Sequence, residues 1–265
     1  MSRFEQKFAE LKAAHRKALV PFITAGDPSL ESTVPVMHAL VAAGADVIEL
    51  GVPFSDPMAD GPVIQRSSER ALARGAGLRY VLEAVEVFRQ QDDATPIVLM
   101  GYLNPVEIHG AERFAREAVV AGVDGVLLVD LPPEEAGETR AVFERAGLAL
   151  IALASPTTSP ERLQRLCETA QGYLYYVSFA GVTGASDRLD TAAAGERLKQ
   201  LRAKSRVPVV AGFGIKDADS ARAMATDADG VVVGSALVAA LAESGSDAAA
   251  RASAFLAPLR AALDA

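Results

Sequence analysis

The fold is decided by a pattern that is clearest in GVLLVDLPPEEAGETRAVFERAGLALIAL, residues 125–153. An apolar run, Gly125–Val129, is followed by a segment with helical spacing, Pro133–Ala146, and then by a second apolar run, Ala149–Leu153. Strands that alternate with amphipathic helices at this spacing indicate βαβ units and a parallel sheet. Strands covered by helices on one face and by a packed interior on the other read as nearly continuous apolar runs, as these do.

The same alternation extends through the rest of the chain. Six further apolar runs are predicted strands: Leu19–Thr24, Val47–Leu50, Pro96–Met100, Leu174–Val177, Val207–Ala211 and Gly230–Val233. Six further segments have helical spacing: Leu30–Ala43, Tyr80–Gln91, Ala111–Ala121, Pro160–Thr169, Ala193–Lys204 and Asp217–Thr226. A last helix is expected to end near Leu263.

Eight strand-helix units in 265 residues predict a closed (β/α)8 TIM barrel of the α/β class, as a single domain over residues 1–265. A doubly wound open sheet is the alternative. It would usually show fewer strands and a Gly-x-Gly-x-x-Gly turn after the first, and Thr24–Pro28 lacks that turn. Phe4, Phe8 and Leu11 are spaced as one face of a helix, which predicts an extra N-terminal helix that plugs the bottom of the barrel.

Composition excludes several classes of protein. The chain carries 26 basic and 34 acidic side chains, a net charge of −8, and this balance argues against nucleic-acid binding. Cys167 is the only cysteine and the three histidines lie far apart, so an internal disulfide is impossible and no metal site is expected. No apolar run reaches the about 18 residues of a membrane span, and the N-terminus lacks the apolar stretch of a signal peptide. We therefore expect a soluble, cytoplasmic protein.

The strand Val47–Leu50 ends unusually, because it carries a glutamate. Side chains alternate along a strand, so if Ile48 and Leu50 face the helices, Glu49 points into the barrel. A partly desolvated carboxyl group near the catalytic rim has a raised pKa and can donate a proton near neutral pH. The alternative is a salt bridge to a neighbouring strand, but none of the predicted strands contains lysine or arginine.

The segment that follows, Val52–Pro62, is stiff and acidic, with three prolines and two aspartates. It could bring Asp56 or Asp60 near Glu49, giving two carboxyl groups in different environments and hence acid and base roles. It could equally be a surface turn, because Asp, Pro and Gly are turn residues.

Glycine-bearing segments follow three consecutive predicted strands: Gly181–Gly184, Ala211–Ile215 and Val233–Ser235. Glycines leave backbone N–H groups open to an oxyanion, and a helix N-terminus adds the positive end of its dipole. Since phosphate sites in such barrels often use the loops after the last two strands, the pattern favours a phosphate site over ordinary turns. Apolar and aromatic residues near the strand ends suggest a flat pocket, although each alone could be core: Phe22, Met100, Tyr102, Leu127, Leu153, Tyr175 and Phe213.

Residues 48–62, IELGVPFSDPMADGP, resemble the signature of the tryptophan synthase α subunit family. Further segments resemble the family in the same order along the chain: PFITAGDP (21–28), YLNP (102–105), VDLP (129–132), GVTG (181–184), GFGI (212–215) and VGS (233–235). The resemblance covers essentially the whole chain.

This resemblance implies a lyase without metal or organic cofactor that cleaves indole-3-glycerol phosphate to indole and glyceraldehyde 3-phosphate by a retro-aldol step. It implies that Glu49 protonates C3 of the indole ring and removes a proton from the glycerol hydroxyl, while Asp60 stabilises positive charge on the indole nitrogen. The implied substrate contacts are Phe22, Met100, Tyr102, Leu127, Leu153, Tyr175, Thr183 and Phe213, and the implied phosphate contacts are Gly184, Gly214, Gly234 and Ser235.

The resemblance also implies a partner. In the family an α subunit passes indole to a β subunit, which uses pyridoxal phosphate to join it to serine, within an αββα heterotetramer. The implied contact surfaces are Pro53–Asp60 and the region of Asn104–Pro105, and the loop carrying Thr183 is implied to close over the substrate. One departure is Phe179, where the family is expected to carry arginine, which puts lid closure and signalling to the partner in doubt.

Three other functions compete with this lyase. One is a degenerate barrel kept as a scaffold. The presence of Glu49, Asp60 and the phosphate-loop glycines argues against it, because an inactive copy has no reason to retain them all. Another is a related phosphate-binding barrel of the same pathway, either an isomerase or the enzyme that forms indoleglycerol phosphate. These enzymes lack the Pro53–Asp60 loop. A free-standing lyase that releases indole without a partner is a variant of the leading hypothesis and stays open.

Overall fold

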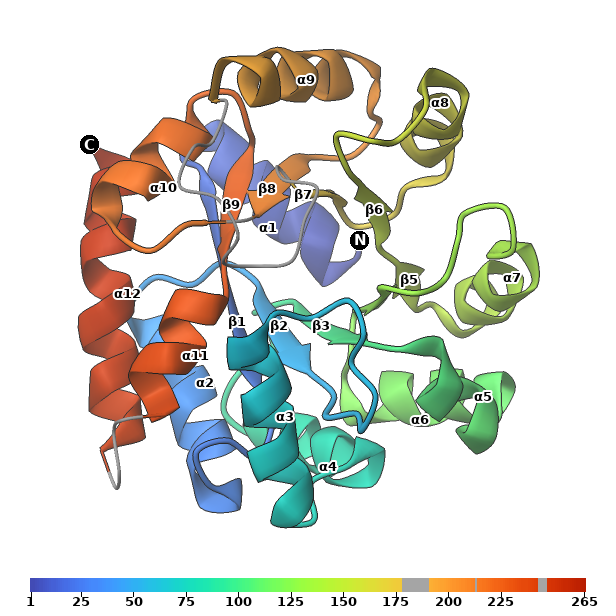
Figure 1. Cartoon of the computed structure of the whole chain (residues 1–265), viewed down its shortest axis with the longest axis vertical. Coiled ribbons are helices and arrows are strands. Elements are labelled where there is room, and N and C mark those ends of the chain that lie inside the picture. The colour runs from blue at the N-terminus through green and yellow to red at the C-terminus, as the bar shows by residue number, and fades with distance from the viewer. Residues whose placement is uncertain (178–190, 213, 243–246) are drawn as a thin grey trace.

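The computed structural model describes residues 1–177, 191–212, 214–242 and 247–265 (Figure 1). Within these ranges, nine strands form one wholly parallel sheet in the order β5-β4-β3-β2-β1-β9-β8-β7-β6. The strands are β1 (Ala18–Thr24), β2 (Ile48–Gly51), β3 (Ile97–Gly101), β4 (Gly125–Leu128), β5 (Ala149–Leu150), β6 (Ala152–Ala154), β7 (Leu174–Val177), β8 (Val209–Gly212) and β9 (Gly230–Val233).

The sheet closes because β5 and β6 are two halves of one extended segment, 149–154, separated only by Ile151. The first half pairs with β4, with Ala149 opposite Gly125. The second half pairs with β7, with Ala152 opposite Leu174. Counted as one strand, this segment makes the eight-stranded closed barrel that the sequence predicts, and the TIM-barrel prediction is confirmed.

Helices surround the sheet (Figure 1). Their bounds are α1 (Arg3–Ala13), α2 (Thr33–Ala42), α3 (Pro62–Ala73), α4 (Leu78–Arg89), α5 (Leu103–His109), α6 (Ala111–Ala121), α7 (Gly137–Ala146), α8 (Pro160–Thr169), α9 (Thr191–Lys204), α10 (Ala218–Ala225), α11 (Ser235–Ala242) and α12 (Ala248–Asp264), with a 3₁₀ turn at Leu30–Ser32. None of these described helices is long and apolar enough to cross a membrane.

Two helices, α3 and α5, were not expected from the sequence. The buried face of α3 consists of small residues, Ser67, Ser68 and Ala71, so it carries no apolar stripe. Helix α5 has only 7 residues and buries one apolar side chain, Val106, which is too short a stretch for a periodic signal.

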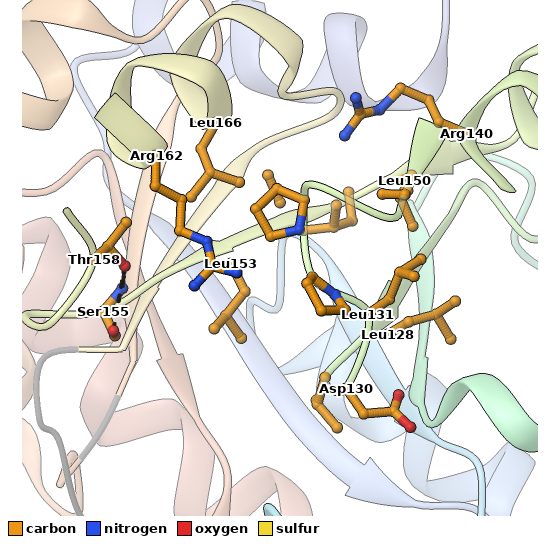
Figure 2. A pocket seen from close by; sticks show the side chains of 16 residues that line it. Leu128, Asp130, Leu131, Arg140, Leu150, Leu153, Ser155, Thr158, Arg162 and Leu166 are labelled. Carbon is orange, nitrogen blue, oxygen red and sulfur yellow. Dashed lines mark hydrogen bonds between the residues drawn. The ribbon is translucent and has the colours of Figure 1, made fainter. Parts of the chain in front are cut away.

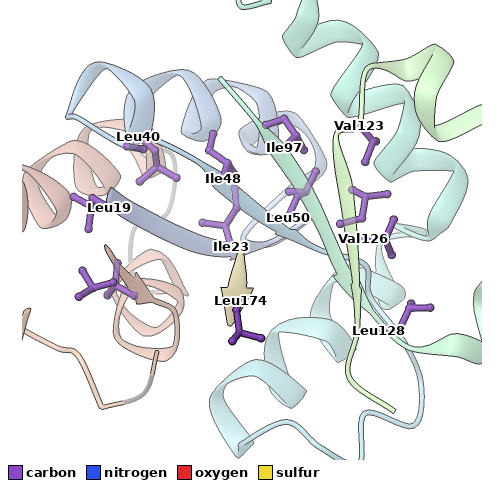
Figure 3. Close-up of a cluster of buried hydrophobic side chains, with 14 of the residues drawn as sticks. Leu19, Ile23, Leu40, Ile48, Leu50, Ile97, Val123, Val126, Leu128 and Leu174 are labelled. Carbon is purple, nitrogen blue, oxygen red and sulfur yellow. The ribbon is translucent and has the colours of Figure 1, made fainter. Parts of the chain in front are cut away.

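Apolar side chains form two layers. Alternate strand residues pack outward against the helices, among them Leu19, Ile23, Ile48, Leu50, Ile97, Val126 and Leu128 (Figure 3). The residues between them fill the barrel interior, among them Val20, Val47, Val98, Leu127, Val210 and Val232. Phe4 and Leu11 of α1 belong to this inner cluster. The predicted N-terminal helix is therefore present, and its apolar face contributes to the barrel's interior.

Hydrogen bonds repeat around the N-terminal rim of the barrel. At four places, a side chain that stands just before one strand accepts a hydrogen bond from a backbone N–H near the start of the strand before it in the chain. The pairs of acceptor and donor are Asp46 and Leu19, Asp124 and Ile97, Gln171 and Leu150, and Asp229 and Val209. The three aspartates are also paired with arginines: Asp46 with Arg260, Asp124 with Arg89 and Asp229 with Arg202. Each of these four strand pairs is thus joined at its start by a side chain, charged in three pairs and a neutral amide in the fourth, which helps to fix its register.

We expect Asp124→Ala to destabilise the protein by about 3 kcal/mol, because the Arg89 guanidinium, only 10% exposed, loses its carboxylate at 2.8 Å and keeps only that of Asp92 at 4.0 Å. It also removes the acceptor of the Ile97 N–H. Urea unfolding followed by circular dichroism measures the change. The control is Asp219→Ala on α10, whose side chain is 94% exposed and whose loss should change stability by less than about 0.5 kcal/mol. Equal effects of the two substitutions would contradict the structural role of the rim.

Candidate active site

Glu49 lies inside the barrel and is completely buried. Its neighbours Ile48 and Leu50 pack in the outer apolar layer, so the strand's alternation turns Glu49 inward, as the sequence indicates. The adjacent strands β1 and β3 place Phe22 and Val98 opposite it. Glu49 is therefore a carboxyl group in an interior otherwise built of apolar and aromatic side chains.

One hydroxyl group orients this carboxyl group. The Tyr173 hydroxyl donates a short hydrogen bond to Glu49 Oε1, while Oε2 is buried and has no partner among the described residues. Burial raises the pKa of Glu49 to about 7, and the bond from Tyr173 offsets part of that rise. The result is a carboxyl group that holds its proton to neutral pH and has one oxygen available.

Tyr173 was missed by the sequence analysis, although a signal was present. It stands one residue before the predicted strand Leu174–Val177, two positions from Tyr175. Residues two apart on an extended chain share a face, so the inward side of Tyr175 would have placed Tyr173 on the same side, nearer the bottom of the barrel.

The second carboxyl group is Asp60, which the loop after β2 holds against Tyr102. The Tyr102 hydroxyl donates to Asp60 Oδ2 at 3.0 Å and accepts from the Ala59 N–H at 3.0 Å. The Phe54 ring packs on Tyr102 with centroids 5.2 Å apart. Burial raises the pKa of Asp60 to about 6, again partly offset by the tyrosine hydrogen bond. The other candidate, Asp56, is exposed, and its carboxylate accepts a hydrogen bond from the Ser55 hydroxyl, so the structure separates the two aspartates.

Tyr175 feels both carboxyl groups. Removal from water, followed by the charges of Glu49 and Asp60, raises the pKa of its hydroxyl well above the usual value, so the three groups lie within electrostatic reach of one another. The position of this ring depends on Gly212, where any Cβ would collide with the Tyr175 hydroxyl. Likewise, a Cβ added at Gly51 would lie 2.6 Å from the Phe22 ring, so the position of that ring depends on Gly51.

The other predicted pocket residues are only partly brought together by what the structure describes. Met100, Leu127, Leu153 and Tyr175 join the inner apolar cluster, and Phe22 lies beside Gly51 and Gly234. Among the predicted phosphate contacts, Gly214 follows β8 with a left-handed φ of 69°, and Gly234 and Ser235 connect β9 to the start of α11. Thr183, Gly184, Phe213 and the atypical Phe179 lie outside the described residues.

Strands β8 and β9 are neighbours in the sheet, so their carboxyl ends, with Gly214 and Gly234, lie at one side of the barrel mouth. The backbone there combines a left-handed glycine with a helix start, which is the arrangement that binds oxyanions. In the described ranges no group of three or more His, Cys, Asp or Glu residues could hold a metal ion.

Known proteins resemble this chain along its whole length. The family model described as tryptophan synthase alpha chain matches residues 8–263. The tryptophan synthase alpha chain of Xanthomonas euvesicatoria pv. vesicatoria (strain 85-10) is 77% identical, over 100% of this chain and 99% of that protein. The solved structure of tryptophan synthase subunit alpha from Legionella pneumophila str. Paris has 47% identity and a TM-score of 0.93, covering 100% and 99% of the two chains. A chain of the aminoacrylate-bound tryptophan synthase of M. tuberculosis has 37% identity and a TM-score of 0.88, covering 99% and 100%.

The raised pKa of Glu49 predicts a pH-dependent loss of stability. The folded protein keeps the proton up to about pH 7 while the unfolded chain loses it near 4.5, so the free energy of unfolding falls as the pH rises between these values. We expect Glu49→Gln to raise the free energy of unfolding by about 2–3 kcal/mol near pH 8 and by little near pH 4.5. Urea unfolding at both pH values measures it. The control Glu83→Gln, whose side chain is 58% exposed, should change stability little at either pH, and a pH-independent effect of Glu49→Gln would contradict the buried charge.

Proposed function

The chain belongs to the tryptophan synthase alpha chain family, and we propose which of its residues carry out that family's reaction. The activity is the cleavage of indole-3-glycerol phosphate to indole and glyceraldehyde 3-phosphate. This is a retro-aldol step, in which the bond between the indole C3 atom and the glycerol chain breaks. The bond breaks readily only after C3 has been protonated, because the ring then accepts the electron pair.

We propose Glu49 as the group that moves both protons. The observation that carries this assignment is its buried carboxyl group with a pKa of about 7, one oxygen held by Tyr173 and the other unpartnered. It enters the reaction protonated and gives its proton to C3. The resulting carboxylate removes the proton of the adjacent glycerol hydroxyl as that carbon becomes an aldehyde. Glu49 is then protonated again, the C–C electron pair has returned to the ring, and indole is released.

Asp60 is proposed to stabilise the positive charge that protonation creates on the ring. With a pKa of about 6 it is mostly ionised at neutral pH, so its carboxylate can accept the hydrogen bond of the indole N–H. Tyr102 holds one carboxylate oxygen at 3.0 Å and leaves the other for the substrate. Such preorganised charge acts strongly in a site shielded from water.

The remaining proposed contacts divide between the two ends of the substrate. Phe22, Met100, Tyr102, Leu127, Leu153 and Tyr175 would surround the indole ring, together with Thr183 and Phe213 from outside the described residues. Gly214, Gly234 and Ser235, together with Gly184, would bind the phosphate. The support for this end is the start of α11 beside β9 and the left-handed Gly214 beside β8.

We further propose that this chain works in the cytoplasm with a tryptophan synthase β subunit, as an αββα assembly that passes indole on for L-tryptophan synthesis. Two exposed apolar side chains support a docking surface at the proposed contact segments. Met58, on the loop after β2, is 82% exposed, and Ile108, on α5, is 79% exposed. These segments are joined through Tyr102, which binds Ala59 and packs on Phe54.

Activity and its pH dependence test the catalytic assignment. Glu49→Gln should lower kcat/KM for indole release by at least about 100-fold, and Asp60→Asn by on the order of 100-fold. In the unmodified chain kcat/KM should rise with pH through about 6 as Asp60 ionises, and fall through about 7 as Glu49 loses its proton. Asp60→Asn should remove the rising limb and keep the falling one.

The matched control for this test is Asp56→Asn on the same loop, exposed and apart from Tyr102, which should leave the isolated chain's kinetics unchanged. Near-normal activity of Glu49→Gln, with its fold intact, would remove Glu49 from the mechanism. A rising limb that survives in Asp60→Asn would assign that limb to another group.

Partner binding has a separate test. Met58→Asp and Ile108→Asp should each weaken binding of the β subunit by at least about tenfold, because a charge replaces an apolar contact at the interface. Calorimetric titration with the β subunit measures this, and indole release by the isolated chain should not change. The control Val120→Asp, on α6 and 82% exposed, should bind normally. Unchanged affinity of both test variants would move the interface elsewhere, and rapid indole release that the partner does not increase would favour a free-standing lyase.

A further inference from the structure

Strands β4 and β6 are not paired with each other in the barrel wall. Ladder pairs join Gly125 to Ala149 and Val126 to Leu150, and the Ile151 N–H bonds to the Val126 carbonyl at 2.8 Å. Beyond this point the fifth strand pairs with β7 instead, while β4 continues beside β3. Over the described residues, no ladder pair joins the upper half of β4 to β6.

A cavity of about 240 Å³ fills this gap (Figure 2). Part of its lining belongs to the inner apolar cluster, namely Val129, Ile151 and Leu153. Another part belongs to the outer layer and includes Leu128, Leu150 and Leu166. The cavity therefore crosses the barrel wall, from the interior cluster to the space beside α7 and α8, which stand apart in Figure 1.

Two guanidinium groups border the cavity, Arg140 of α7 and Arg162 of α8. Nη2 of Arg162 is bound to Glu134 at 2.6 Å. Arg140, in contrast, has a buried Nε without any hydrogen-bond partner among the described residues. A buried N–H of a charged group costs free energy unless an acceptor is supplied. Among the polar atoms that line this cavity, the buried Nε of Arg140 is the donor that a ligand could satisfy.

The lining carries charges of both signs. In Figure 2 the charged side chains Arg140, Arg162 and Asp130 lie at three separate places around the leucines of the lining. One oxygen of Asp130 accepts the Leu103 N–H at 2.8 Å, which fixes the position of this carboxylate. An anionic group in this cavity would be attracted by the two arginines and repelled by Asp130, so its favoured place is beside an arginine.

We propose that this cavity is a second ligand site for a small carboxylate that carries an apolar ring; it shares Leu153 with the proposed indole pocket but extends through the barrel wall toward α7 and α8. The ring lies among the leucines of the wall, where burial of apolar surface favours it. The carboxylate accepts a hydrogen bond from the unpartnered Nε of Arg140, and hydrogen bonds between a guanidinium group and a carboxylate are stronger than those between neutral groups. A bare phosphate has no apolar part for the same lining. Neither Glu49 nor Asp60 lines the cavity, so the site does not depend on the catalytic assignment.

Phenylacetate is the probe for this site, and 2-phenylethanol is its neutral counterpart. In methyl NMR spectra of the full chain, phenylacetate should shift the signals of Leu128, Leu150 and Leu166. The alcohol should bind at least about tenfold more weakly, because a hydrogen bond to a charged group contributes about that factor. Inorganic phosphate should also bind at least about tenfold more weakly, because it leaves the apolar lining without a contact. Arg140→Gln should weaken phenylacetate binding by at least about tenfold and leave kcat/KM for indole release unchanged.

Two further variants keep the test decisive. Arg145→Gln, on the same helix but 65% exposed and outside the lining, should bind phenylacetate normally. Ala136→Leu, at a buried lining position, fills the cavity without changing charge and should abolish binding, which covers the case that Arg140→Gln fails to fold.

Three outcomes would overturn the proposal. The first is absence of binding at millimolar phenylacetate. The second is equal binding by the unmodified chain and by Arg140→Gln or Ala136→Leu. The third is binding that shifts only Met100 and Leu127 at the barrel interior and competes with the substrate, which would place the probe in the mouth.

Discussion

The structure depends on one segment that serves two neighbours. Residues 149–154 bond to β4 with their first half and to β7 with their second, and the exchange at Ile151 closes the sheet. Along most of the ring each strand is bonded on both sides, and inward side chains fill the interior. Because α1 also packs into the inner cluster, Glu49 on the inner face of β2 is completely buried. The same exchange leaves the upper part of β4 without a partner on that side, so closure and the cavity beside it have a single cause.

Burial in that interior explains both why Glu49 lowers the stability of the protein at neutral pH and why its carboxyl group keeps a proton there. A completely buried carboxyl group resists ionisation, and the chain accepts lower stability at neutral pH in return for a proton held at a pKa of about 7. Tyr173 limits this cost through one hydrogen bond to Oε1 and does not satisfy Oε2. A second donor would lower the pKa further and occupy the oxygen that has to meet the substrate. The incomplete hydrogen bonding of Glu49 therefore fits its proposed role better than full satisfaction would.

What the sequence predicts well is whatever depends on local periodicity. The strands and most helices follow from alternation and spacing, and α6 and α8 have the expected bounds, Ala111–Ala121 and Pro160–Thr169. The inward direction of Glu49 follows from the same rule. Contacts between distant segments carry no such period. Nothing in the sequence around Asp56 or Asp60 indicates which of the two contacts Tyr102, which lies 42 residues beyond Asp60. Helix α3 could not be predicted from an apolar pattern, because its buried residues are small. Assigning chemistry to these residues required the family signature in addition to the periodicity.

The two carboxyl groups are held in different ways, and this difference bears on how the site can vary. Glu49 is fixed by a strand in the closed ring. Asp60 lies on a loop, but α3 begins two residues later and is tied to the end of β1 through Thr24 and Ser67, whose hydroxyl oxygens are 2.6 Å apart. Arg70 adds a bidentate ion pair with the buried Asp27 at 2.8 and 2.7 Å. Asp60 is thus anchored on one side by α3 and on the other by Tyr102. Since none of the contacts described for these anchors involves Glu49, a change in α3 is expected to move Asp60, the group proposed to face the indole nitrogen, while Glu49, the proposed proton donor, keeps its position.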